Sequence, residues 1–359
     1  MLRRNFGRGV AAINPTFVGL LSTTLPLGQS IGVFSVLANG LLIAAAVMLP
    51  ETRGRELTAD SRDGQHCKPP SSARCERFAV MQLKQSDYVL GHTDREQSRL
   101  IRQARVLAPA TEHFLRDAGI VSGMRVLDIG CGVGDVTMLV ARLVGPQGKV
   151  VSIDLDQASI CTAQRRAAAL GIDNATFRQA DISVFTDVEP FDAIVGRLVL
   201  EFLPDPAATI KRLSGLLQSG GIMAFQEPSW KIWLSYTSHL PLRMAVTTIL
   251  RDVFVAGGAN TEMELPLYQG FVAANLTSPQ LRVTLPVGDS PEFRSLLHDL
   301  LLAVWARAEA LRMPLDRLGD PATLALRLDD ELDASKSFAS YVGLVGAFAR
   351  KREVPTNAA

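Results

Sequence analysis

A glycine-rich turn preceded by an acid has the residue types and spacing of a nucleotide-binding site. Residues 126–135 read VLDIGCGVGD, in which Asp128 stands two positions before the first of three glycines, Gly130, Gly132 and Gly134. A turn of this kind between a strand and a helix lets the backbone approach a ligand closely, because glycine has no Cβ. The amides at the start of the following helix add partial positive charge.

The spacing of the turn and its acid argue against a pyrophosphate ligand. A dinucleotide fold carries G-x-G-x-x-G, whose third glycine allows the helix to pack closely on the strand. The spacing here is G-x-G-x-G. Asp128 would repel a pyrophosphate, and it suits a ligand group with a positive charge, such as an amino group or a sulfonium.

Two further acids stand where the next two predicted strands end. Asp154 ends the strand KVVSID and lies 26 residues after Asp128; a carboxylate there can accept hydrogen bonds from both hydroxyls of a ribose. Asp181 follows the third strand, where it could accept from an adenine amino group. Each acid also has a structural explanation, as a helix N-cap for Asp154 and as the start of a loop for Asp181. Together they match the amino-acid, ribose and adenine parts of S-adenosylmethionine.

Strands and helices alternate through the segment that carries these residues. Short apolar runs predict strands, and amphipathic or alanine-rich runs predict helices between them. This alternation favours a parallel sheet covered on both faces, and the handedness of crossovers then gives a doubly wound, Rossmann-like α/β fold. The predicted strands are 125–129, 149–154, 175–178, 191–196 and 221–227, and the predicted helices are 136–143, 158–170 and 205–217.

Helices flank this segment on both sides. Residues 93–96 read TDRE, a capping box, so a helix should begin there, with a second helix over 111–118. After residue 227 the pattern becomes mostly helical. A last strand is predicted over 340–349, and its Gly343 and Gly346 are tolerable in an edge strand or a hairpin partner. The other elements predicted there are helices over 242–255, 267–276, 291–311 and 321–332, and a strand over 280–287.

The order of these motifs resembles class I S-adenosylmethionine-dependent methyltransferases. The matching motifs are VLDIGCGVGD, VVSIDLD, QADI, FDAIVGRLVLEFLPD and LQSGGIMAFQEPSW. YVLGHTDREQSRLIRQARV and VGLVGAFARK extend the resemblance over residues 88–352. The resemblance implies a seven-stranded sheet in the order 3-2-1-4-5-7-6, with strand seven antiparallel and formed by 340–349. It implies a domain over 87–352, with cap elements at 230–278 and 290–336.

The resemblance also assigns the cofactor, S-adenosylmethionine, to particular residues. Asp128 and the turn over 130–134 would hold its methionine part, and Arg197 would line the pocket. Cys131 is a common small residue in such turns and receives no redox or nucleophilic role. The full set of expected cofactor residues is Asp128, Gly130, Cys131, Gly132, Gly134, Asp154 and Leu155 at the ribose, Asp181 and Ile182 at the adenine, and Arg197.

The methyl acceptor would be a small organic molecule beneath the apolar cap helices. Glu227 ends the fifth strand and either lines the acceptor site or binds Arg197. For the aromatic residues, packing within the cap is the more economical explanation. No residue is assigned as catalytic, and the five histidines have no metal-ligand spacing. The candidates for the acceptor wall are Glu227, Trp230, Trp233, Tyr236, His239, Tyr268 and His298.

The first fifty residues differ from the rest. Residues 9–50 contain no charged residue or histidine, and 31–49 and 10–27 resemble membrane spans. Arginines on both sides would place the two flanks, and the domain that follows, in the cytoplasm. MLPETRGREL resembles the end of the last helix of major facilitator superfamily transporters, over residues 1–57. Two helices cannot form a transport cavity, so this segment is either a membrane anchor or a relic of a fusion or start site. Residues 58–86 read as a linker.

Composition narrows the classes of function. A formal net charge of +1 argues against a dedicated nucleic-acid binder, and four cysteines without a CxxC pair fit a reducing compartment. Two other functions stay open. One is a nicotinamide-dependent oxidoreductase, which the glycine spacing and Asp128 oppose. The other is a membrane-tethered, non-catalytic methyltransferase-like protein.

Overall fold

The computed structural model describes residues 94–353 of the chain. The apolar stretches within 10–49, the transporter-like residues 1–57, the linker 58–86 and the capping residue Thr93 all lie outside these residues. Within 94–353, no helix combines the length and the apolar character needed to cross a membrane.

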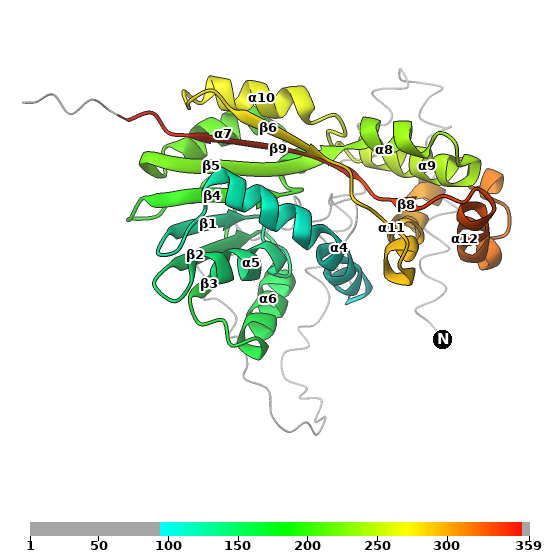
Figure 1. Cartoon of the computed structure of the whole chain (residues 1–359), viewed down its shortest axis with the longest axis horizontal. Helices are drawn as coiled ribbons and strands as arrows, with labels where there is room; N and C mark the ends of the chain where they lie inside the picture. Colours follow the sequence, from blue (N-terminus) through cyan, green and yellow to red (C-terminus); the bar gives the residue numbers. More distant parts are fainter. Residues whose placement is uncertain (1–93, 354–359) are drawn as a thin grey trace, which may run out of the picture. The chain divides into compact units, whose positions relative to one another are not determined.

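Seven strands form one sheet in the order β3-β2-β1-β4-β5-β9-β6 (Figure 1). The first five of these run parallel, whereas β9 pairs antiparallel with both β5 and β6. The predicted Rossmann-like sheet, with its antiparallel seventh strand, is therefore confirmed. The strands are β1 Arg125–Ile129, β2 Lys149–Asp154, β3 Ala175–Gln179, β4 Phe191–Arg197, β5 Leu217–Ser229, β6 Gln280–Thr284 and β9 Gly343–Arg350.

Successive apolar residues of the central strands face opposite layers of helices. In β1, Val126 packs into a core with helices α4 and α5, and Leu127 packs into a core with α7 and α10. Both faces are buried, which explains why the strands read as continuous apolar runs rather than as alternating ones. The helices of these layers are α4 Asp94–Ala118, α5 Asp135–Val144, α6 Gln157–Ala169, α7 Pro206–Ser214 and α10 Glu264–Ala273.

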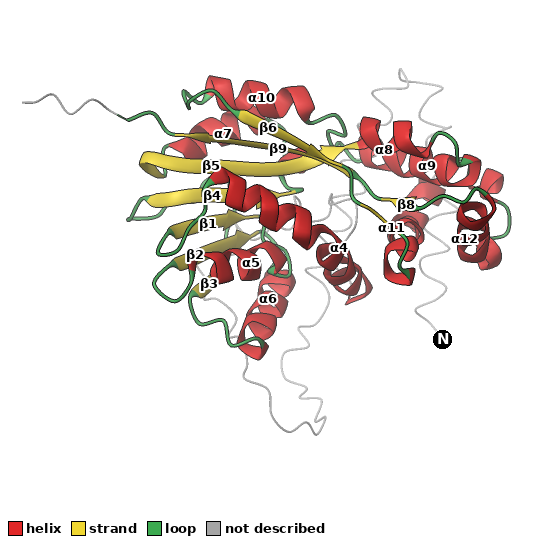
Figure 2. Ribbon diagram, in the orientation of Figure 1, coloured by secondary structure: helices red, strands yellow, loops and turns green. Residues whose placement is uncertain are grey.

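Four more helices gather beyond the carboxyl end of β5 (Figure 2). They enclose a third core around Trp233, Leu250 and Leu301. We call this group the cap: α8 Trp230–Thr237, α9 Pro241–Ala256, α11 Pro291–Ala310 and α12 Leu324–Ala334. Helix α10 lies within the segment 230–278 that was assigned to the cap, yet it packs on α7 and the sheet.

The structure differs from the predicted elements at three main places. The two helices expected around 96–118 are one helix, α4, which continues through Pro109; packing of its apolar face outweighs the amide hydrogen that proline lacks. The strand expected over 280–287 ends at Thr284, and Val287–Gly288 forms β7 with β8, Ala339–Ser340. Helix α8 was not predicted; Ser229 caps it by accepting from the amide of Ile232.

Strand β9 lies inside the sheet, between β5 and β6, where the strand order implied by the resemblance places it. Its glycines reflect close packing of helices on the strand. A Cβ at Gly346 would lie 2.4 Å from the ring of Phe114 in α4, and one at Gly343 would lie 3.0 Å from the carbonyl oxygen of Ser229. Phe114 also meets Phe348 edge to face, with ring centroids 5.8 Å apart.

We therefore expect Gly346→Ala to lower the free energy of unfolding by about 1–3 kcal/mol, the usual cost of overpacking a core. Urea denaturation of the single variant, of Phe114→Leu and of the double variant measures the coupling. The cost should shrink in the Phe114→Leu background, where the ring is gone. An equal cost in both backgrounds would contradict the steric explanation.

Candidate functional site

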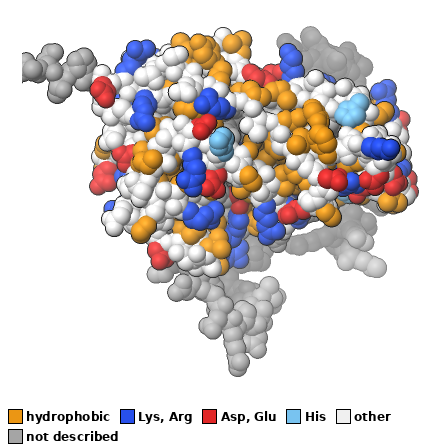
Figure 3. Space-filling view, in the orientation of Figure 1, with side chains coloured by type: hydrophobic (Ala, Val, Ile, Leu, Met, Phe, Trp, Pro, Cys, Tyr) orange, Lys and Arg blue, Asp and Glu red, His pale blue; other side chains and the backbone are white. Residues whose placement is uncertain are grey.

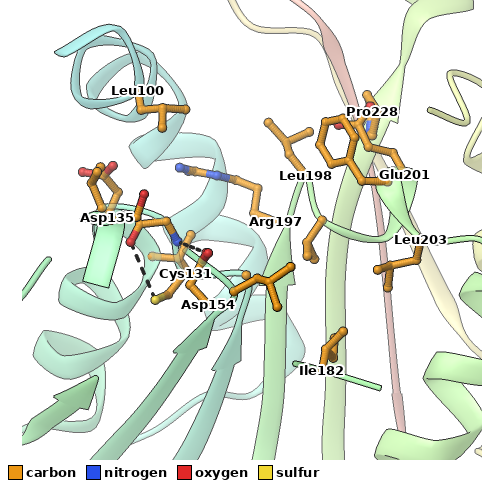
Figure 4. A pocket seen from close by; sticks show the side chains of 18 of the residues that line it. Leu100, Cys131, Asp135, Asp154, Ile182, Arg197, Leu198, Glu201, Leu203 and Pro228 are labelled. Atoms are coloured by element: carbon orange, nitrogen blue, oxygen red, sulfur yellow. Dashed lines mark hydrogen bonds between the residues drawn. The ribbon is translucent and has the colours of Figure 1, made fainter. Parts of the chain in front are cut away.

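One cavity of about 600 Å³ opens where β1, β2 and β4 end, between the sheet and the cap. The loops after these strands form one wall, and residues of α4, α9, α11 and the segment before β9 form the other. Figure 4 shows Cys131, Asp154 and Arg197 on one side of this space, and Glu201 and Leu203 on the other. Ligand sites in parallel α/β folds occupy this position, beyond the carboxyl ends of the strands.

The glycine turn after β1 is shaped by close approaches. Gly130 and Gly132 have φ values of +63° and +52°, a backbone conformation that residues other than glycine rarely adopt. A Cβ at Gly130 would lie 2.3 Å from Val199, so this glycine lets the loop after β4 approach the turn. A Cβ at Gly132 would meet nothing within 4 Å, and Gly132 lines the cavity. The turn thus presents bare backbone to a ligand at Gly132.

The carboxylate of Asp154 connects the end of β2 to this turn. One oxygen accepts from the amide of Gly132 at 2.7 Å, and the other accepts from the amide of Asp156 at 2.9 Å. Asp154 lines the cavity and does not cap α6; that role belongs to Asp156. An ionised carboxylate has about four acceptor positions, which suits it to bind several donors at once.

Most of the predicted cofactor residues come together at this cavity. Gly130, Cys131, Gly132, Asp154 and Leu155 line it, as do Asp181, Ile182 and Arg197. Asp128 and Gly134 are absent from its wall. Gly134 is the N-cap of α5, where a Cβ would lie 3.0 Å from that of Ala163.

Asp128 lies beneath the turn, with 1% of its surface exposed. Its carboxylate accepts a 2.6 Å hydrogen bond from Thr137. Burial raises the pKa of Asp128 to about 7; the Thr137 hydrogen bond and the charge of Arg197 oppose this shift only in part. Asp128 therefore acts on the cavity through the turn and its field rather than by contact.

Arg197 lines the cavity, whereas the fifth-strand acid, Glu227, neither lines it nor binds Arg197. Arg197 donates to the hydroxyl of Thr111 at 3.0 Å, and burial lowers its pKa against the opposing charges of Asp135 and Asp128. Glu227 does not bind it. Instead, Glu227 accepts from the amides of Val199, Leu200 and Glu201 at 3.1–3.3 Å. These amides belong to η2 (Leu200–Phe202) and the residue before it.

Comparison with known proteins agrees with this geometry. A family described as "Methyltransferase domain" matches residues 120–260. A trans-aconitate 2-methyltransferase from Methylobacterium radiotolerans is 29% identical over 209 residues, covering 56% of this chain and 74% of that protein. An aklanonic acid methyltransferase from a Streptomyces species is 35% identical over 112 residues, covering 31% and 51%. A ubiquinone biosynthesis O-methyltransferase from Paracidovorax citrulli is 32% identical over 107 residues, covering 29% and 44%.

The chain contains a class I S-adenosylmethionine-dependent methyltransferase domain. Its matches to the second and third of these relatives span about half of their length. S-adenosylmethionine is the cofactor of this domain, and the cavity fits its parts. Gly132 offers bare backbone, Asp154 a carboxylate on the cavity wall, and Arg197 a half-buried cation that donates to the hydroxyl of Thr111.

Few of the residues proposed for the acceptor wall line the cavity. Among the seven candidates only Trp230 lines the cavity. Trp233 is buried behind it, and its indole N–H donates to the carbonyl of Ser340. Tyr236, His239 and Tyr268 are exposed, and His239 pairs with Ser337. His298 is half-buried on α11, away from the cavity wall.

A polar network on the cavity wall was not predicted from the sequence. Arg99 of α4 donates to both oxygens of Glu96 at 2.6 and 2.8 Å, and to Gln103 at 2.6 Å. The hydroxyl of Tyr341 donates to the same Gln103 oxygen at 2.7 Å. Spacings of three and four residues in a helix could have grouped the first three. No local signal could have paired them with Tyr341, which lies 238 residues after Gln103.

Two more features of the wall were missed. Glu201 lines the cavity next to Phe202, and Leu198 takes a φ of +55° at the end of β4. A left-handed conformation costs a residue other than glycine about 1–2 kcal/mol, and such strain gathers at functional sites. Leu198 is held there by the hydrogen bond from its amide to the carbonyl of Gln226.

The raised pKa of Asp128 makes stability depend on pH in a defined direction. The pKa of Asp128 is higher in the folded protein than in the unfolded chain. Its neutral carboxyl therefore contributes its full stabilisation below about pH 4, and this contribution is lost as the pH rises through about 7. Asp128→Asn keeps an acceptor for Thr137 and removes the charge. We expect the variant to be more stable than the native chain at pH 8 by on the order of 2 kcal/mol.

Thermal unfolding of both proteins at pH 5 and pH 8 checks this expectation. The advantage of Asp128→Asn should be small at pH 5 and larger at pH 8. A constant difference, or a less stable variant at pH 8, would show that Asp128 is ionised and favourably paired in the folded protein.

Proposed function

We propose that the chain transfers a methyl group from S-adenosylmethionine to a small organic acceptor held in the cavity. The main support for this proposal is that the glycine turn, Asp154 and aromatic and apolar residues of the cap all line one cavity. When bound, the cofactor supplies a methyl group on a positively charged sulfur. A single enclosed space can then bring acceptor and donor together.

The cofactor residues follow from this arrangement. The backbone around Gly132, with Gly130 and Cys131, holds the methionine part, and Asp154 with Leu155 accepts the ribose hydroxyls. Asp181 and Ile182 flank the adenine, and Arg197 faces the methionine carboxylate. Asp128 and Gly134 support the turn without contacting the ligand.

The acceptor shares the cavity with the cofactor, so its size is limited. Phe202, Phe254 and Leu300 give the cap side an apolar lining, which suits a small organic molecule. The relatives named for trans-aconitate, aklanonic acid and ubiquinone biosynthesis are consistent with such an acceptor. On the face drawn in Figure 3, acidic and basic side chains are interspersed, without the continuous basic field that nucleic acid requires.

The residues of the chain contribute alignment and exclusion of water. The cap and η2 cover the strand ends, so the reacting groups meet in a space from which solvent is largely removed. Positioning of this kind can contribute about 7–11 kcal/mol to lowering a barrier.

Binding of S-adenosylhomocysteine tests the proposal directly. At 100 times its Kd, a ligand that binds only the folded state stabilises it by about 2.7 kcal/mol, whereas NAD should give no thermal shift. Asp154→Asn should weaken S-adenosylhomocysteine binding about tenfold or more, since a hydrogen bond to a charged group contributes about 1.5–3 kcal/mol. Asp173→Asn, which changes an exposed acid before β3, is the matched control and should bind normally. A shift with NAD alone would point to an oxidoreductase.

A further inference from the structure

An isolated carboxyl group lies on the cap side of the cavity. Glu201, in η2, lines the cavity and is only 4% exposed. Its Oε2 has no hydrogen-bond partner among residues 94–353. Leaving a buried polar atom unpaired costs about 1–3 kcal/mol, so a ligand that pairs with it gains specificity. The position of this carboxyl is set by Glu227, which accepts from the amide of Glu201.

An isolated donor lies on the same wall. Trp230 is 2% exposed, lines the cavity, and its Nε1–H has no acceptor among the described residues. Its ring packs against Phe254 at 5.0 Å and Trp233 at 5.4 Å between centroids, which holds it in place. The cap side of the cavity therefore carries one unmatched acid and one unmatched N–H donor within aromatic surroundings.

The charges near Glu201 disfavour an anionic acceptor. Glu227 acts on Glu201 as a like charge, so a carboxylate placed there would meet acidic groups. Arg99 does not offset them, because both of its hydrogen bonds at 2.6 and 2.8 Å to Glu96 neutralise it. The other arginine of the wall, Arg197, lies on the cofactor side (Figure 4).

The hydrogen-bonding inventory also separates a hydroxyl from an amine. A protonated amine has donors only, and it would leave the N–H of Trp230 unmatched. A hydroxyl has one donor for the carboxylate of Glu201 and lone pairs for an N–H. An aromatic ring that carries the hydroxyl would fit the walls formed by Phe202, Phe254 and Trp230.

We propose that the acceptor is an aromatic hydroxyl compound, and that Glu201 binds its hydroxyl and takes its proton, with Trp230 as the second hydrogen-bonding partner. This inference rests on the proposed function. As the acceptor oxygen forms its bond to the methyl carbon, the sulfur–methyl bond breaks and its electron pair stays on sulfur. The hydroxyl proton passes to the carboxylate of Glu201, so the ether product leaves uncharged.

The protonation state of Glu201 then determines how the rate of methyl transfer depends on pH. Burial, followed by the charge of Glu227, raises the pKa of Glu201 well above its ordinary range. Tyr341, on which Arg99 and Glu96 of α4 also act, is a further titratable group that interacts with Glu201. The ionised, proton-accepting form is lost as pH falls, so the rate should fall with it, at a midpoint higher than for an ordinary glutamate.

The test uses three probes on one ring system, 1-naphthol, 1-naphthoate and 1-naphthylmethylamine, which is protonated at neutral pH, with the full chain saturated by S-adenosylhomocysteine. Calorimetric titration should show binding of 1-naphthol in preference to the other two. Glu201→Gln and Trp230→Phe should each weaken it about tenfold, while Glu112→Gln, on the exposed face of α4, should leave it unchanged. S-adenosylhomocysteine should bind all variants equally, which also shows that they are folded.

Methylation of 1-naphthol with labelled S-adenosylmethionine supplies the second readout. Glu201→Gln should lower kcat about 10²–10⁴-fold, as expected when a proton acceptor is removed, and should abolish the fall in rate at low pH. Glu201→Asp should recover part of the rate.

Each other outcome has a defined meaning. If S-adenosylhomocysteine binds but 1-naphthol does not, or 1-naphthoate binds more tightly, the acceptor assignment is overturned and the proposed function stands. Unchanged binding and pH profile in Glu201→Gln would overturn the role of Glu201. Failure to bind S-adenosylhomocysteine would overturn the proposed function itself.

Discussion

The buried carboxylate of Glu227 holds together the part of the molecule on which the cavity depends. It ends the long strand β5 and accepts three backbone amides from the segment that follows β4. Without a carboxylate there, these amides would be buried and unpaired, and η2 would have no fixed position. Gly130 completes the arrangement, because only a residue without Cβ admits Val199 at that distance. The hydrogen bonds of Glu227 and the missing Cβ of Gly130 together place the glycine turn and the cap on opposite sides of one cavity.

Several groups at this site lower the stability of the folded protein and are placed where a ligand can bind. Burial raises the pKa of Asp128, Glu201 and Glu227, so three carboxyl groups are held where their charged forms are disfavoured. Leu198 adds backbone strain, and the N–H of Trp230 stays unmatched. The cores around the site are apolar and closely packed. Unfavourable groups that gather in one cavity of a well-packed domain are typical of a site arranged for a ligand.

Most of the sheet could be predicted from the sequence, because a strand buried on both faces reads as an apolar run ended by glycine or an acid. Strands β1 and β2 have the predicted bounds for this reason. Elements whose form depends on distant partners were harder to predict. Helix α4 continues through Pro109 only because the sheet and cap pack on it, and β9 carries glycines because Phe114 and Ile232 approach it. Neither partner is close in sequence to the element that it shapes.

The sequence by itself indicated the residues that we propose for the cofactor. The glycine turn, Asp154 and Asp181 lie directly after strands, and parallel strands place their carboxyl ends along one edge. Only the tertiary structure decided which residues form the acceptor end. Glu201, Trp230, Tyr341 and the Arg99 network come from segments separated by up to 242 residues. It also separated Glu227 from Arg197 and placed Asp128 under the turn. Burial and hydrogen-bond partners depend on three-dimensional packing, and local patterns of residue types do not encode them.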